Sequence, residues 1–401
     1  MLTNIEIIDY LLSNLSNDFY QTIFYILLFT LTTILFYKNT LDIDKGKKDN
    51  TKAELFDLMK DTPVIYIKSL SNLTGYNIYA KCEYFSYYSP KDRVVKRVLL
   101  TAERKGLINK NTTIFENSTG LSGYSVASIS QLLGYKSTIV IPDSCPSILV
   151  SQISRTNCNL IKTKKADFSN FSDNFIRKCK KLSEENENSF YINLYQNELN
   201  HITHFEETAP ELFNQLNKKV DAFVCCMDTG GTLSGISNYL KIKNEKCIIG
   251  LADIEGSGFY SYIKEGVLFR QEIKVDKKNK EYDYIDDISK DNCFLNNNLR
   301  KANIDECYLT DYNEVMFLID YLKNNDGINI GIKEGINLVG ILKMIEDKKH
   351  ILPVNANIAT IFFGNGLYDS EIISKYNKEN NPIKNIEQIF NLNWNQILFI
   401  L

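Results

Sequence analysis

Ser89-Pro90-Lys91-Asp92-Arg93 follows an apolar run of sequence and opens an amphipathic one, so it lies where a strand passes into a helix. Ser89 suits the N-cap of that helix, Pro90 its first position and Asp92 its capping-box position. Lys91 then lies at the positive end of the helix dipole, which disfavours the ammonium form and lowers its pKa. A lysine that reacts with an aldehyde needs such a pKa, so Lys91 is the candidate catalytic residue. A solvated lysine at a helix start is the alternative.

Two further stretches place glycines and small residues between an apolar run and a helical one. They are Glu116-Asn117-Ser118-Thr119-Gly120-Leu121-Ser122-Gly123 and, after the apolar run Phe223–Met227, Asp228-Thr229-Gly230-Gly231-Thr232-Leu233-Ser234-Gly235. In each, backbone N–H groups can converge at a helix N-terminus and hold a carboxylate or a phosphate. The second stretch is not a P-loop, because no Gly-Lys-Ser/Thr follows it. Taken alone, either stretch is also consistent with a glycine-rich turn that binds nothing.

Short apolar runs alternate with amphipathic runs over most of the chain after residue 52. We predict strands at Val64–Lys68, Ile78–Phe85, Thr113–Phe115, Thr138–Ile141, Phe223–Met227, Cys247–Leu251 and Ile358–Phe363. We predict helices at Asp92–Arg104, Tyr124–Leu133, Phe205–Leu216 and Thr232–Leu240. This alternation predicts an α/β fold with parallel sheets that helices cover on both faces. Residues 272–306 are rich in Lys, Asp and Asn without a period, and they predict an insertion or a mobile loop.

In this order and spacing, the three motifs resemble those of the fold-type II pyridoxal-phosphate (PLP) enzymes of the cysteine synthase and cystathionine β-synthase family. The resemblance covers roughly Asp61 to Ser370. It includes Thr62-Pro63, the run Asn77–Glu83, and a signature at Asn197, Asn200, His204, Thr208, Pro210 and Glu211. It implies two twisted, mainly parallel sheet domains, interleaved within residues 53–375 and followed by a C-terminal tail at 376–401.

The resemblance also implies a role for each motif. Lys91 would bond the aldehyde of the cofactor and later carry the α-proton of the substrate. The cofactor phosphate would lie on backbone amides of Asp228, Thr229, Gly230, Gly231 and Thr232, and Glu334 would lie near the cofactor ring. The amino-acid carboxylate would lie on Ser118, Thr119, Gly120 and Ser122. The reaction would be β-replacement, in which an activated serine loses its leaving group and sulfide adds to give L-cysteine. The family implies a homodimer.

The chain departs from the family pattern at several positions around the expected site. Leu121 replaces a hydrogen-bonding residue beside the cofactor, Asp228 replaces the first glycine of the phosphate loop, and Lys333-Glu334 replaces a Ser-Ser pair near the pyridine nitrogen. Further departures lie at Asp286–Ser289, at Leu194 and at Gly364-Asn365-Gly366. These changes indicate a partly dismantled site. Three functions stay open: an active cysteine synthase or lyase, a PLP enzyme of changed reaction such as a deaminase, and a membrane-tethered pseudoenzyme that acts as a scaffold.

The N-terminal 52 residues predict a membrane anchor and a polar linker. Phe19 to Tyr37 carries no charge, and 19 helical residues would span about 28 Å, close to the hydrocarbon thickness of a bilayer. Acidic residues precede the span, and lysines at 38, 45, 47 and 48 follow it, which predicts a cytosolic C-terminal domain. A buried core helix is the alternative. Leu251-Ala252-Asp253 and Gly256–Tyr260 resemble a fungal subgroup that an N-terminal helix anchors in the mitochondrial outer membrane.

Composition argues against several other functions. The net charge of −3, with no dense basic face, gives no support for nucleic-acid binding. The nine cysteines form no C-x-x-C pair, so neither a zinc site nor a disulfide framework is expected. Because the chain has only three histidines, we expect no multi-histidine metal centre.

Overall fold

The computed structural model describes residues 54–164, 174–267 and 296–379, together with Thr30. The chain divides into two units, Met1–Glu54 and Leu55–Leu401, and the fold described here is that of the second unit. Apart from Thr30, the predicted span at 19–37 lies outside the described residues. None of the helices within them has both the length and the apolar character that crossing a bilayer requires.

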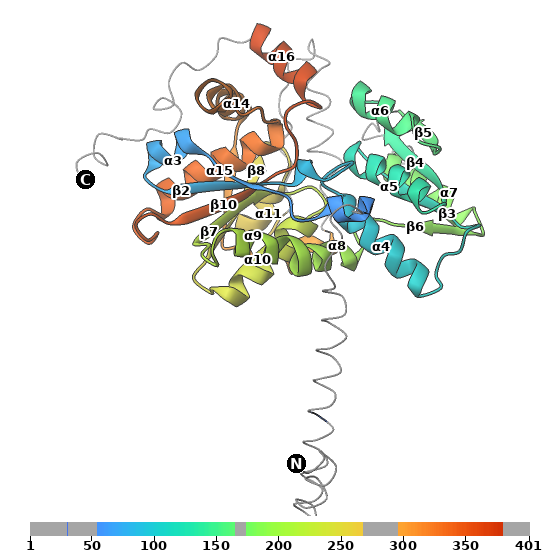
Figure 1. Ribbon diagram of the computed structural model, residues 1–401. Helices are drawn as coiled ribbons and strands as arrows, with labels where there is room; N and C mark the ends of the chain where they lie inside the picture. Colours follow the sequence, from blue (N-terminus) through green and yellow to red (C-terminus); the bar gives the residue numbers. More distant parts are fainter. Residues whose placement is uncertain (1–29, 31–53, 165–173, 268–295, 380–401) are drawn as a thin grey trace, which may run out of the picture. The chain divides into compact units, whose positions relative to one another are not determined.

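The larger of two sheets has six strands in the order β1-β2-β10-β7-β8-β9, of which Figure 1 labels β2, β10, β7 and β8. The strands are β1 (Val64–Tyr66), β2 (Asn77–Cys82), β7 (Ala222–Cys226), β8 (Ile248–Ile254), β9 (Glu306–Thr310) and β10 (Asn357–Phe362). Only β1 runs antiparallel to its neighbour, and the other pairs are parallel. One face packs on α3 (Lys68–Thr74), α14 (Tyr312–Asp326) and α15 (Ile332–Lys348). The other packs on α9 (Ala209–Gln215), α10 (Gly231–Lys243), α11 (Phe259–Glu265) and α13 (Asn297–Lys301).

The smaller sheet has four parallel strands in the order β5-β4-β3-β6. They are β3 (Thr113–Asn117), β4 (Lys136–Pro142), β5 (Asn159–Thr163) and β6 (Ser189–Tyr191). One face packs on α4 (Asp92–Arg104), α5 (Leu121–Leu132) and α6 (Ser147–Ser154), and the other on α7 (Phe175–Glu184). The remaining elements are the short helices η1 (Leu55–Met59), η2 (Glu83–Phe85), α8 (Glu198–Thr203), the π-helical turn η4 (His204–Thr208) and α16 (Ser370–Glu379). The predicted architecture of mainly parallel sheets covered on both faces is confirmed.

The structure corrects several boundaries. Residues 296–306 were expected to form part of an irregular insertion, but they contain α13 and the start of β9. A helix of five residues is too short to show a hydrophobic period, which is why the sequence gave no sign of it. Residues 272–295 of that segment lie outside the described part. The expected tail at 376 begins inside α16, which extends to Glu379.

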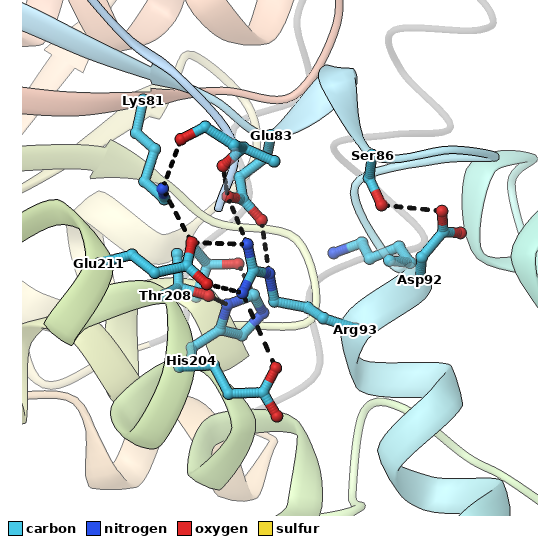
Figure 2. A network of polar contacts seen from close by, with 12 residues as sticks. Lys81, Glu83, Ser86, Asp92, Arg93, His204, Thr208 and Glu211 are labelled. Atoms are coloured by element: carbon cyan, nitrogen blue, oxygen red, sulfur yellow. Dashed lines mark hydrogen bonds and ion pairs between the residues drawn. The ribbon is translucent and has the colours of Figure 1, made fainter. Parts of the chain in front are cut away.

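A buried ion network joins elements of the two sheets (Figure 2). Arg93, on α4, is 2% exposed and makes two hydrogen bonds to the Glu83 carboxylate, at 2.9 and 3.0 Å. Nη1 and Nη2 of the same guanidinium donate to the two oxygens of Glu211 on α9, at 3.0 and 3.1 Å, so Nη2 contacts both carboxylates. Lys81 on β2 is fully buried, and its Nζ lies 2.9 Å from Glu211 Oε2. The network therefore fixes the start of α4 against the larger sheet and its helices.

We predict that Arg93→Ala lowers the free energy of unfolding by about 3–5 kcal/mol, because it leaves Glu83 charged, buried and without its main partner. Arg97→Ala is the matched control on the same helix, because Arg97 pairs with the more exposed Glu206 and Glu207. That variant should lose less than about 1 kcal/mol. Urea unfolding of the two variants measures the difference, and equal losses would show that Arg93 is not the central ion of the network.

Candidate active site

Helix N-termini and strand ends from both sheets surround one cavity. Parallel strands end at the same edge of a sheet, so the turns that follow β3 and β7 and open α5 and α10 can face a common space. The cavity is lined by parts of all three sequence motifs, by the first turn of α15, and by residues from the segment 363–369. Among the predicted site residues, the lining includes Lys91, Thr119, Ser122, Asp228, Thr229, Gly230, Thr232 and Glu334.

Lys91 lies in this cavity and is 9% exposed, so it is not a solvated surface lysine. It occupies the N-cap of α4, and its Nζ lies 5.9 Å from the centre of the Phe363 ring. Burial lowers the pKa of Lys91 below its usual value, and the nearby Asp228 carboxylate opposes that shift. The sequence attributed the lowered pKa to the helix dipole, whereas desolvation is the larger cause in the structure.

Asp92 holds the turn that carries Lys91. Its carboxylate accepts hydrogen bonds from the backbone N–H groups of Tyr88 and Ser89, at 2.7 and 3.1 Å, and from the Ser86 hydroxyl at 2.8 Å. The Ser125 hydroxyl of α5 donates to the same carboxylate. The helix begins at Asp92 instead of at Pro90, so Lys91 and not Ser89 is the N-cap. The hydrogen bond that the Ser89 N–H donates to the Asp92 carboxylate is nevertheless one that the predicted capping box requires.

Ser118 organises the loop after β3 instead of facing the cavity. Its hydroxyl oxygen accepts hydrogen bonds from the N–H groups of Gly120 and Gly123 and from the Ser122 hydroxyl, each at 2.8 Å. Gly120 has φ +145° and contacts Leu149 so closely that a Cβ would lie 2.4 Å from it. Ser118 and Gly120 therefore shape the loop, while Thr119 and Ser122 reach the cavity. Leu121 lines the cavity as well, as its place in the motif led us to expect.

The loop Thr229-Gly230-Gly231-Thr232 forms the start of α10. Gly230 has φ +79°, and a Cβ on Gly231 would lie 2.0 Å from Asn200 Oδ1, so both positions need glycine. The first N–H groups of a helix have no partner within it, and at this cavity they form a site for an anion. Gly231 itself backs onto Asn200 and does not line the cavity.

Buried asparagines brace this loop, and the sequence indicated only one of them. Asn200, which the family signature included, donates to Thr229 Oγ1 at 3.0 Å. Asn298, on the unexpected helix α13, donates to the Thr229 carbonyl at 2.8 Å and is fully buried. Asn337 on α15 accepts from the Cys226 N–H and donates to the Ile361 carbonyl, which ties β7 to β10. Asn298 and Asn337 lack a motif, and only their position in the fold identifies them.

Glu334 is a buried structural acceptor at the N-terminus of α15. One carboxylate oxygen accepts from the Gly331 N–H at 2.9 Å, and the other from the N–H groups of Phe363 and Gly364 at 2.8 and 3.0 Å. Burial, and then the nearby Asp369 carboxylate, raise the pKa of Glu334 to about 7. Glu334 thus holds the cavity wall at 363–364 through its side chain.

Asp228 and Lys333 contact each other across the cavity. Lys333 Nζ lies 3.3 Å from Asp228 Oδ2, and the Tyr195 hydroxyl lies 3.4 Å from Asp228 Oδ1. Although burial alone would raise it, Lys333 and then Lys91 hold the pKa of Asp228 below its usual value. Two of the departures from the family pattern are therefore partners of each other. A third, Leu194, is fully buried in the core, and the departures at 286–289 lie outside the described residues.

The residues present fit the cofactor that the motifs imply. A buried lysine with a lowered pKa shares a cavity with the glycine-rich start of α10, whose N–H groups suit a phosphate. The loop from Ser118 to Ser122 offers the start of a second helix, α5, at the same cavity, and its N–H groups suit a carboxylate. An aldehyde, a phosphate and an amino-acid carboxylate each have a matching partner here.

Comparison with known proteins points to the same chemistry. Residues 55–364 match the family described as "Pyridoxal-phosphate dependent enzyme". The chain is 29% identical over 374 residues to a putative mitochondrial cysteine synthase of Saccharomyces cerevisiae, covering 89% of this chain and 92% of that one. It is 30% identical over 335 residues to a cysteine synthase of Dictyostelium discoideum, covering 80% and 84%. The solved O-acetylserine dependent cystathionine beta-synthase of Helicobacter pylori superposes with a TM-score of 0.66 at 21% identity, covering 82% and 98%.

We predict that Glu334 makes the chain less stable as the pH rises from about 4.5 to about 7. The Glu334 carboxyl ionises near pH 4.5 in the unfolded chain, whereas in the folded chain it keeps its proton up to about pH 7. Between these pH values, ionisation therefore stabilises the unfolded state relative to the folded one. The contribution of Glu334 to this loss in unfolding free energy should be on the order of 3 kcal/mol. Urea unfolding of the wild type and of Glu334→Gln at pH 5, 6, 7 and 8 measures it as the difference between the two curves. Glu334→Gln cannot ionise, so its curve should fall less steeply than that of the wild type, and parallel curves would contradict the assignment.

Proposed function

The chain belongs to the family of pyridoxal-phosphate dependent enzymes and its cofactor is pyridoxal phosphate, and we propose that it catalyses β-replacement on an activated serine. In this reaction sulfide replaces the leaving group at Cβ and the product is L-cysteine. The observation that carries the proposal is the position of Lys91, buried in the cavity that the starts of α5 and α10 also border. The relatedness to cysteine synthases supports the same reaction.

Pyridoxal phosphate, when bound, supplies the electron sink for cleavage of bonds at Cα and loss of the group at Cβ. The chain itself supplies position and proton transfer. Lys91 would hold the cofactor through its Nζ, and its lowered pKa favours the unprotonated, nucleophilic amine relative to an exposed lysine. Once released by the substrate amine, the same Nζ would take the proton from Cα and return it after sulfide has added at Cβ.

The other lining residues would orient the ligands. Backbone N–H groups from Gly230 to Thr232 would hold the cofactor phosphate. Thr119 and Ser122, at the start of α5, would bind the substrate carboxylate. Contacts of this kind would bring the Cα–H bond toward Lys91, whose Nζ faces the same cavity. Glu334 would act indirectly, because its carboxylate is occupied by backbone N–H groups of the cavity wall.

Leu121 favours a second candidate, a pseudoenzyme that keeps the fold as a membrane-tethered scaffold. Leu121 lines the cavity and cannot donate a hydrogen bond to the cofactor. A PLP lyase or deaminase of changed specificity is the remaining possibility. We favour the synthase because Lys91 remains in place and because Asp228 has a cationic partner in Lys333.

We also propose that residues 19–37 anchor the protein in a membrane, with residues 53–375 on the cytosolic side. The uncharged span, the acidic residues before it and the lysines after it support this topology. The relatedness to a putative mitochondrial cysteine synthase is consistent with the mitochondrial outer membrane. Like the family that it resembles, the chain would act as a homodimer.

We predict that the purified protein binds PLP in a saturable way, with a visible absorbance band that Lys91→Ala abolishes. Lys96→Ala is the matched control, because Lys96 lies on the same helix and does not line the cavity. It should leave the band intact. With O-acetylserine and sulfide, the wild-type protein should form cysteine and the Lys91→Ala variant should not. A Lys91-dependent band without cysteine formation would exclude the proposed synthase reaction. If no band forms at all, the pseudoenzyme scaffold is the function that remains.

We predict that carbonate washing of membranes leaves the protein in the pellet, because an apolar span of this length is held by the bilayer and not by charge. Deletion of residues 1–52 should release it to the supernatant. Protease added to intact organelles should degrade the large domain. Extraction of the full chain by carbonate would contradict the anchor, and complete protection from protease would contradict the topology.

A further inference from the structure

Asp228 and Lys333 form an ion pair next to the loop that begins α10. Asp228 directly precedes Thr229, and its side chain is 18% exposed. Lys333 is the second residue of α15, and its side chain is 27% exposed. Their 3.3 Å contact is the one hydrogen bond of the Lys333 ammonium to the described part of the chain. An ammonium has three N–H donors, so donors remain for a ligand in the cavity that Lys333 lines.

An anionic ligand in this cavity needs the Asp228–Lys333 ion pair, because acidic side chains outnumber lysines in the lining. Among the described residues, the lining includes three acidic side chains, Asp228, Glu334 and Asp369, and two lysines, Lys91 and Lys333. Lys91 is taken up by the aldehyde end of the cofactor in the proposed function. A phosphate at the start of α10 carries close to two negative charges at neutral pH, so an uncompensated Asp228 beside it would be repulsive.

Resting on the proposed cofactor site, we propose that Lys333 is the positioning residue on which phosphate binding depends: its ammonium cancels the Asp228 charge, which would otherwise repel the phosphate. Asp228 in turn needs Lys333 and keeps its side chain in the cavity. Two consequences follow for PLP binding. Loss of Lys333 alone weakens binding, because Asp228 is left without its cation. Loss of both residues together leaves binding nearly unchanged, because neither charge remains.

The experiment is a double-mutant cycle on the full chain with Lys333→Ser, Asp228→Gly and the double variant. Serine and glycine are the residues that the family resemblance places at these positions. Dissociation constants are measured for PLP and for pyridoxal, which lacks the phosphate. Lys343→Ser is the control, because Lys343 lies on the same helix, pairs with Glu314 at 2.7 Å and does not line the cavity.

We expect Lys333→Ser to weaken PLP binding about ten- to a hundredfold, because it leaves Asp228 as an unpaired charge beside the phosphate. Asp228→Gly should bind PLP at least as tightly as the wild type, and the double variant should recover to within about threefold of it. Pyridoxal binding should change by less than about threefold in every variant, because pyridoxal lacks the phosphate that an unpaired Asp228 would repel. The control should match the wild type for both ligands.

Three results would overturn the proposal: unchanged PLP binding in Lys333→Ser, equal weakening for PLP and pyridoxal, or effects of the two substitutions that simply add. A second measurement does not depend on Lys91 chemistry. Inorganic phosphate should raise the thermal unfolding midpoint of the wild type and of Lys91→Ala, but not of Lys333→Ser. If no variant forms the Lys91-dependent band, the proposed function fails, while the phosphate measurement still decides the role of Lys333.

Discussion

Arg93 lies two residues after Lys91, and its ion pairs with Glu83 and Glu211 determine where the lysine can reach. Helix α4 packs with the smaller sheet, whereas β2 and α9 belong to the larger one. The cavity is lined by residues from both, so it keeps its shape only while α4 is fixed against the larger sheet. A buried guanidinium with two carboxylate partners does this with directional contacts, which apolar packing alone does not supply. The position of Lys91 thus depends on a network whose residues do not line the cavity.

Much of the fold and part of the site followed from the sequence. The alternation of short apolar runs with helical ones was enough for the parallel sheets, because strands buried on both faces are nearly continuous in apolar residues. The turn before α10 was identified by its glycines: Gly230 has φ +79°, and a Cβ on Gly231 would clash with Asn200. Three local roles did not follow. Ser118 braces its own loop, Glu334 holds the wall at Phe363, and Asn298 supports Thr229 from a helix of five residues.

These three roles could not be predicted because the sequence shows residue types and their spacing, but not which residues contact each other in the fold. Asp228 and Lys333 are 105 positions apart, so each was interpreted alone as a loss. In the structure they form one neutral ion pair, so they are one coupled change to the site and not two independent losses. Glu334 similarly changes from a candidate partner of the cofactor ring to a helix and loop anchor. A departure from a family pattern therefore carries meaning only once its contacts are known.

The free energies of the lost contacts bear on whether the site is dismantled. The clearest uncompensated change among the described residues is Leu121, whose side chain cannot make the hydrogen bond that the family resemblance places beside the cofactor, a contribution of about 0.5–1.5 kcal/mol. That corresponds to a loss of roughly two- to twelvefold in affinity, because each 1.4 kcal/mol is a factor of ten. A cofactor held by a covalent bond to Lys91 and by several backbone N–H groups can lose one such bond and stay bound. In the proposed function the remaining contacts would outweigh the lost one, so the Leu121 side chain would lower the affinity for the cofactor without abolishing the reaction.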